Sequence, residues 1–145
     1  MEKIEQSIVI SRPIEEVFAF VSDYRNDPRW RTGIVEFSQT PEGPTAAGTR
    51  LREVLRLAGL RLETASEVIE YEPNRKCTIK STSGPIPLRN WRLVEPAPGG
   101  TRFTYAIVGE SSGFYKLAEP VLVAIFRRQL RAELARLKRI LESST

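Results

Sequence analysis

The reactive side chains of this sequence are carboxylates, tyrosines and arginines, because its 145 residues include no histidine and one cysteine, Cys77. Histidine is the commonest general base and metal ligand near neutral pH. Its absence excludes Ser-His-Asp and Cys-His nucleophile systems, and a zinc site would need an improbable all-carboxylate ligand set. Any catalysis must therefore use a carboxylate, a tyrosine, an arginine or ordered water, and we expect neither a metal nor a cofactor.

Glu53 is the carboxylate with the most unusual sequence context. Residues 48–57 and 60–71 show strand-like alternation and are joined by a tight turn at Ala58-Gly59. The predicted pairs on one face are Leu57–Leu60, Leu55–Leu62, Glu53–Thr64 and Leu51–Ser66. A carboxylate buried on such an apolar face needs partners or has a raised pKa, which makes Glu53 a functional candidate. The alternative is a bulge, or a position at the sheet rim where Glu53 reaches water.

Two predicted strands near the C-terminus, 86–95 and 101–110, supply the other polar candidates. We expect Arg89 and Trp91 to share one face of the first strand, and Phe103 and Tyr105 to share one face of the second. Tyr105 could present its hydroxyl to a pocket, and Arg89 could hold an acidic ligand group through two hydrogen bonds. The alternatives are core packing for the three aromatic residues and a solvated strand end for Arg89.

These residues are positioned by a predicted α+β fold. Strands are predicted over residues 3–10, 34–39, 48–57, 60–71, 76–82, 86–95 and 101–110, and their short connections favour an antiparallel sheet. Two short helical segments follow the first strand, at residues 14–21 and 24–30. Residues 114–142 have apolar side chains at helical spacing and predict one long C-terminal helix. One helix cannot fill the concave face of seven strands, so we expect the sheet to curve around it and leave an apolar cavity.

Composition and charge are those of one globular domain spanning residues 1–145, with 41% hydrophobic and 28% charged residues. The N-terminus has no apolar segment typical of a signal peptide, and no apolar run approaches the roughly 20 residues of a membrane span. We therefore expect a cytoplasmic protein with no membrane span. The net charge of +4 comes from dispersed arginines, which favours a solvated surface over nucleic-acid binding.

Several short motifs occur in an order that resembles the START-like, birch-pollen-allergen-like (SRPBCC) superfamily, and within it the bacterial polyketide cyclase/dehydrase and lipid-transport group. They are Arg12-Pro13-Ile14-Glu15-Glu16-Val17-Phe18, Val21-Ser22-Asp23 with Pro28-Arg29-Trp30, Gly48-Thr49-Arg50, Glu72-Pro73, Gly99-Gly100-Thr101-Arg102 and Leu137-Lys138. The resemblance covers nearly the whole chain. It implies a helix-grip fold with a pocket between sheet and long helix, and it places Trp30 near the pocket entrance.

The leading functional prediction is the binding of a small, mostly hydrophobic ligand, such as a lipid, a polyketide or an isoprenoid-like molecule. Glu53 and Arg89 would orient the ligand in this pocket. The expected lining residues are Trp30, Leu55, Trp91, Phe103, Tyr105, Phe114 and Phe126. Such a lining, apolar with few polar groups, is typical of ligand pockets.

Two alternatives remain open at this stage. The resemblance also allows a cyclase or dehydratase that uses Glu53 or Asp23 as base and Tyr105 or Arg89 as electrophilic stabiliser. A third possibility is an interaction module that meets an acidic protein or RNA through a basic helix face. That face carries Arg127, Arg128, Arg131 and Arg139. The sequence does not distinguish a monomer from a homodimer.

Overall fold

The computed structural model describes residues 3–57, 59–110 and 113–143. These residues form seven strands, three α-helices and one short 3-10 helix. In order, they are β1 (Ile4–Ile10), α1 (Ile14–Val21), η1 (Tyr24–Asn26), α2 (Asp27–Trp30), β2 (Ile34–Thr40), β3 (Arg50–Leu57), β4 (Leu60–Glu72), β5 (Lys76–Ser83), β6 (Leu88–Ala97), β7 (Gly100–Gly109) and α3 (Phe114–Ser143).

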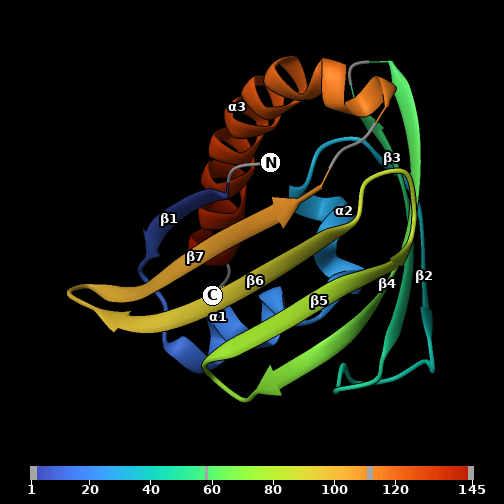
Figure 1. Ribbon diagram of the computed structural model, residues 1–145. Coiled ribbons are helices and arrows are strands. Elements are labelled where there is room, and N and C mark those ends of the chain that lie inside the picture. The colour runs from blue at the N-terminus through green and yellow to red at the C-terminus, as the bar shows by residue number, and fades with distance from the viewer. Residues whose placement is uncertain (1–2, 58, 111–112, 144–145) are drawn as a thin grey trace.

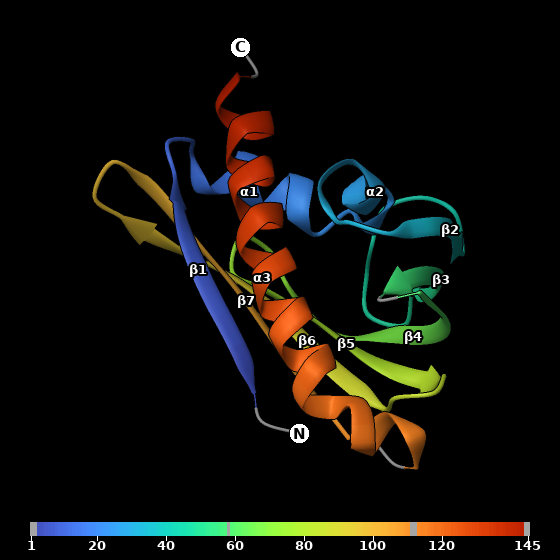
Figure 2. The ribbon, with the colours of Figure 1, turned by 90° about the horizontal axis from the view of Figure 1, so that it is seen from above.

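The strands form one antiparallel sheet in the order β1-β7-β6-β5-β4-β3-β2. The sheet curls strongly, so that β2 and β3 stand nearly upright beside the flatter β5–β7 region (Figure 1). Seen from above, α3 runs across the concave side, and α1 and α2 lie beside its C-terminal half (Figure 2). This arrangement confirms the predicted helix-grip fold. No helix among the described residues is long and apolar enough to cross a membrane.

The predicted pairing of β3 with β4 is confirmed residue by residue. Glu53 lies opposite Thr64, Leu55 opposite Leu62, and Leu57 opposite Leu60. The turn between the strands is short, and a short turn fixes the register. Glu53 therefore faces the concave side of the sheet, as expected.

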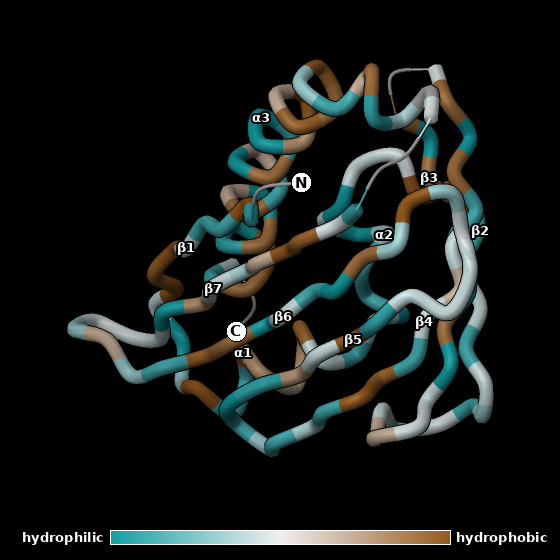
Figure 3. The backbone as a smooth tube through the Cα atoms, in the orientation of Figure 1, coloured by the Kyte–Doolittle hydropathy of each residue, from teal (hydrophilic) through white to brown (hydrophobic). Residues whose placement is uncertain are grey.

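The core lies between α3 and the sheet. Leucines at helical spacing form the buried stripe of α3, namely Leu130, Leu134, Leu137 and Leu141. Along the chain, hydrophobic positions alternate with hydrophilic ones on both α3 and the strands (Figure 3). A second, smaller hydrophobic cluster of Leu57, Leu62 and Leu122 lies under the N-terminal half of α3. The described core is thus divided into a large part near α1 and a small part near the start of α3.

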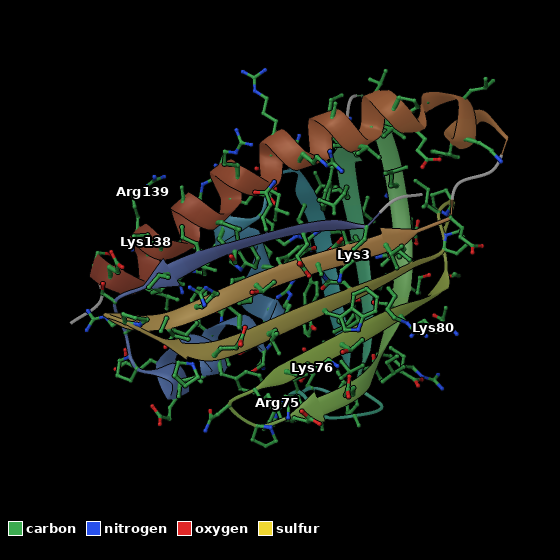
Figure 4. The ribbon with its side chains drawn as sticks, turned by 60° about the vertical axis from the view of Figure 1, so that its left-hand side comes forward. Lys3, Arg75, Lys76, Lys80, Lys138 and Arg139 are labelled. Atoms are coloured by element: carbon green, nitrogen blue, oxygen red, sulfur yellow. The ribbon has the colours of Figure 1, made fainter. Side chains whose placement is uncertain are left out.

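The predicted orientation of β6 is wrong. Arg89 and Trp91 lie on the outer side, where the Arg89 guanidinium is 6.0 Å from the Trp91 ring centre. Lys3, Lys76 and Lys80 run along this side (Figure 4). The inner side of β6 instead carries Asn90, Arg92 and Val94, all buried. The physical reason is that Arg92 forms a buried ion pair with Asp27. This pair offsets the cost of removing Arg92 from water, so a charged residue lies on the inner side, where an apolar one is usual.

Candidate ligand cavity and its buried charge network

A cavity of about 130 Å³ lies between the sheet and α3. Most of its wall is apolar and comes from β3, β4, the β6–β7 pair and α3. Representative apolar lining residues are Leu51, Leu55, Leu62, Ile107, Val123 and Phe126. Its polar lining residues include Tyr24, Arg31, Glu53, Asn90, Arg92 and Tyr105. The cavity therefore combines extensive apolar walls with a defined set of polar groups.

Asp27 is the centre of a buried charge network beside the cavity. Its carboxylate accepts hydrogen bonds from Arg92, with Nη1 at 2.8 Å and Nη2 at 2.6 Å. It also accepts one from Arg31 Nη1 at 3.1 Å. The side chains of Asp27 and Arg92 are each 1% exposed. A bidentate arginine–carboxylate pair of this kind is among the stronger polar contacts in proteins.

Arg31 extends the network to Glu53. Its Nη1 donates to Glu53 Oε1 at 2.7 Å and its Nη2 to Glu53 Oε2 at 3.3 Å. Burial alone would lower the pKa of Arg31, but Glu53, Tyr105 and Asp27 together raise it well above its usual value. Arg31 thus stays charged, and both oxygens of Glu53 are occupied by it.

Aromatic rings enclose the Arg92 guanidinium. Its central carbon lies 4.3 Å from the ring centre of Tyr24, 5.3 Å from that of Trp30 and 5.6 Å from that of Tyr105. Contacts of this length are typical of cation–π interactions. Burial raises the pKa of both tyrosines, so each stays protonated. The Tyr24 hydroxyl donates to Cys77 Sγ at 3.2 Å.

The short helix α2 places the carboxylate and one arginine of the network. Asp27 begins α2 and Arg31 follows its end, so the two side chains are four residues apart on one side of the turn. Arg136 from α3 donates to the backbone oxygen of Trp30 at 2.9 Å, and Glu133 accepts from the Thr32 amide at 2.7 Å. These contacts fix α2 between the sheet and α3.

Two buried polar atoms on residues that line the cavity lack a hydrogen-bond partner among the described residues. They are Asn90 Oδ1 and Arg92 Nε. Asn90 uses its amide nitrogen to donate to the Ala106 carbonyl at 2.9 Å, and Arg92 uses only its two terminal nitrogens. Buried polar groups are usually paired, so both atoms are candidates for contact with a ligand.

The model of one protein family, polyketide cyclase/dehydrase and lipid transport, matches residues 1–142. The chain belongs to this family. No curated protein sequence matches it significantly.

Solved structures show the same fold for this family member. The protein TTHA0849 from Thermus thermophilus is 17% identical, with a TM-score of 0.83, over 99% of this chain and 100% of that chain. The Zhui aromatase/cyclase from Streptomyces sp. R1128 is 15% identical, with a TM-score of 0.77, over 97% and 93%. Ara h 8.0201 is 12% identical, with a TM-score of 0.71, over 99% of each chain.

Some of the site residues predicted from the sequence do lie at the cavity of this protein. Glu53, Leu55, Tyr105 and Phe126 line it. Trp30 and Phe103 are fully buried behind the lining, with ring centres 6.2 Å apart, so Trp30 does not lie at an entrance.

Other predicted site residues lie elsewhere. Trp91 and Arg89 are on the outer side of the sheet and do not line the cavity. Asp23 caps the start of η1 and forms a partly exposed pair with Arg25. The side chain of Phe114 lies outside the described residues.

Sequence reasoning missed Asp27, Arg31, Asn90 and Arg92. A signal for two of them was present in the tight turn at Pro98-Gly99. A two-residue turn there pairs Arg92 with Tyr105, as observed, and so puts Arg92 on the inner side. For Asp27 and Arg31 no local pattern points to burial.

The arrangement can hold an apolar molecule and orient one polar group on it. Among the described residues, no three histidine, cysteine, aspartate or glutamate side chains cluster in a way that could bind a metal ion. The carboxylates at the cavity are paired with arginines.

Proposed function

We propose that this protein binds a small, mostly hydrophobic molecule in the cavity between its sheet and α3. The observation that carries the proposal is the cavity itself, which has largely apolar walls and its polar groups held in fixed positions. Leu55, Tyr105 and Phe126 are the proposed ligand contacts that the sequence also favoured. The family description, which includes lipid transport, supports this interpretation.

The size of the cavity limits the ligand that fits without rearrangement. Its volume is about 130 Å³, whereas pockets for drug-sized ligands typically measure about 300–1,000 Å³. An apolar cavity of about 150 Å³ is enough for benzene. A ring-sized molecule therefore fits the observed form, while a lipid or polyketide requires the walls to separate, for instance within the small cluster of Leu57, Leu62 and Leu122.

Native mass spectrometry of freshly purified protein, followed by isothermal titration calorimetry with toluene, an apolar probe of one ring, tests the proposal. The Leu55→Trp variant should weaken probe binding, because the larger ring occupies the cavity. Ile69→Trp is the matched control, since Ile69 is 42% exposed and does not line the cavity. Absence of a co-purified ligand together with absence of probe binding would refute the proposal.

A second candidate function is a cyclase-type enzyme, because Glu53 and Tyr105 both line the cavity and one structural neighbour is described as an aromatase/cyclase. Both Glu53 oxygens accept hydrogen bonds from Arg31, which leaves this carboxylate poorly placed to take a proton. Turnover of an aromatic polyketide precursor would be measured in wild type and Glu53→Gln. Full turnover by the variant would exclude Glu53 as base.

A further inference from the structure

The inner side of β6 carries an unused acceptor and an unused donor two residues apart. Asn90 Oδ1 and Arg92 Nε are buried and make no hydrogen bond with any described residue. Asn90 and Arg92 both line the cavity and are each 1% exposed. The rest of each side chain is fixed, Asn90 by the Ala106 carbonyl and Arg92 by Asp27.

A hydroxyl group is the smallest chemical group that satisfies both atoms at once. It has one hydrogen to donate and two lone pairs to accept. Residues two apart on a strand point to the same face of the sheet, so the side chains of Asn90 and Arg92 both lie on the face that borders the cavity. A carbonyl or an ether could accept from Arg92 Nε but would leave Asn90 Oδ1 unpaired.

We propose that the cavity takes a neutral apolar molecule bearing a hydroxyl, which donates to Asn90 and accepts from Arg92. This inference rests on the proposed function and adds the chemical class of the ligand.

The charge balance of the network disfavours an anionic ligand. The positive charges of Arg31 and Arg92 are matched by Asp27 and Glu53, with the contacts described above. A ligand carboxylate would therefore bring an unmatched charge into a buried site, which is costly. It would also place a negative charge against Asn90 Oδ1, an acceptor with no hydrogen to offer.

Three probes of similar size, each with one ring, test the inference by isothermal titration calorimetry at pH 7: phenol, toluene and benzoate. By apolar surface alone, toluene should bind best. We expect phenol to bind at least about fivefold more tightly than toluene, since leaving a buried acceptor and donor unpaired costs affinity. We expect benzoate to bind most weakly.

The Asn90→Leu variant should bring the affinities for phenol and toluene to within about twofold. Arg89→Leu is the matched control, because Arg89 is the neighbouring residue on the outer side of β6, and it should keep the wild-type preference. The wild-type comparison needs no variant and stands even where Asn90→Leu fails to fold.

The outcomes separate the two proposals. If wild type binds neither neutral probe, the proposed hydrophobic binding fails and this inference fails with it. If the neutral probes bind equally well, the hydroxyl inference is overturned while hydrophobic binding stands. If benzoate binds most tightly, the ligand is anionic and the inference is overturned.

Discussion

Replacing Asp27 with asparagine should destabilise the protein strongly. The variant keeps the shape of the side chain and removes its charge. Arg92 would lose its ionic partner while remaining enclosed by the rings of Tyr24, Trp30 and Tyr105. Its guanidinium is 1% exposed, so water cannot replace the lost carboxylate.

The expected loss follows from this burial. Breaking a buried ion pair by removing one partner typically costs about 3–5 kcal/mol. For a chain of this length, each kcal/mol lowers the melting temperature by roughly 3 °C. Asp27→Asn should therefore lower the melting temperature by about 10–15 °C. Urea denaturation followed by circular dichroism provides the free energy of unfolding independently.

Asp23→Asn is a matched control for this prediction. Asp23 also holds an arginine through two oxygens, with Arg25 Nε at 2.8 Å and Nη2 at 3.0 Å. Its side chain is 30% exposed and that of Arg25 is 50% exposed, so the pair should contribute under about 1 kcal/mol. Equal destabilisation by the two variants would refute the argument that burial makes the Asp27 pair critical.

A double variant separates two contributions to the free energy of unfolding: that of the Asp27–Arg92 ion pair and the cost of leaving one buried charge unpaired. Asp27→Leu combined with Arg92→Met replaces both ions by apolar side chains and leaves Arg31 its pair with Glu53. Such replacements are often neutral or stabilising. The double variant should thus unfold at a higher urea concentration than Asp27→Asn. A double variant less stable than Asp27→Asn would show that the network contributes more than charge pairing.

Three further predictions concern the scaffold. Burial raises the pKa of Glu133, so the folded protein loses stability as the pH rises above the pKa that Glu133 has in the unfolded chain. Glu133→Gln should therefore melt at a higher temperature than wild type at pH 7, and this gain should vanish below about pH 4. Gly100 has φ +154° and its backbone packs closely on β1, so Gly100→Ala should cost about 1–3 kcal/mol in urea denaturation and more than Gly99→Ala, where φ is +86° and space is open. Leu134→Ala removes a side chain that is 2% exposed and should cost about 2–5 kcal/mol, whereas Leu117→Ala, at 85% exposed, should change the urea midpoint little.

Much of the fold could be predicted because its signals are local. The leucine spacing of α3 predicted its buried stripe, and those leucines are indeed buried. The tight turn between β3 and β4 fixed their register, which placed Glu53 on the inner side. Periodicity and turn length act over a few residues and need no knowledge of distant partners.

The site was harder to predict because its key contacts are long-range. Alternation places apolar residues inside, and on β6 that rule chose Trp91 over Arg92. The burial of Arg92 depends on Asp27, which is 65 residues away in sequence. Nothing near either residue shows that the two charges meet. The two-residue turn at Pro98-Gly99 is the one local feature that pairs Arg92 with Tyr105 and so indicates its inner position.

The buried polar residues of β6 that were not predicted from the sequence are also those that suit the cavity to a ligand. A protein selected only for stability would fill the inner side of β6 with apolar residues, because a partly satisfied polar network is less stable than an apolar core. Natural proteins break such local rules mainly at functional sites. Asn90 and Arg92 break the rule together, on one strand and facing one cavity. Their unused acceptor and donor cost stability in the free protein, and a bound hydroxyl group would offset that cost.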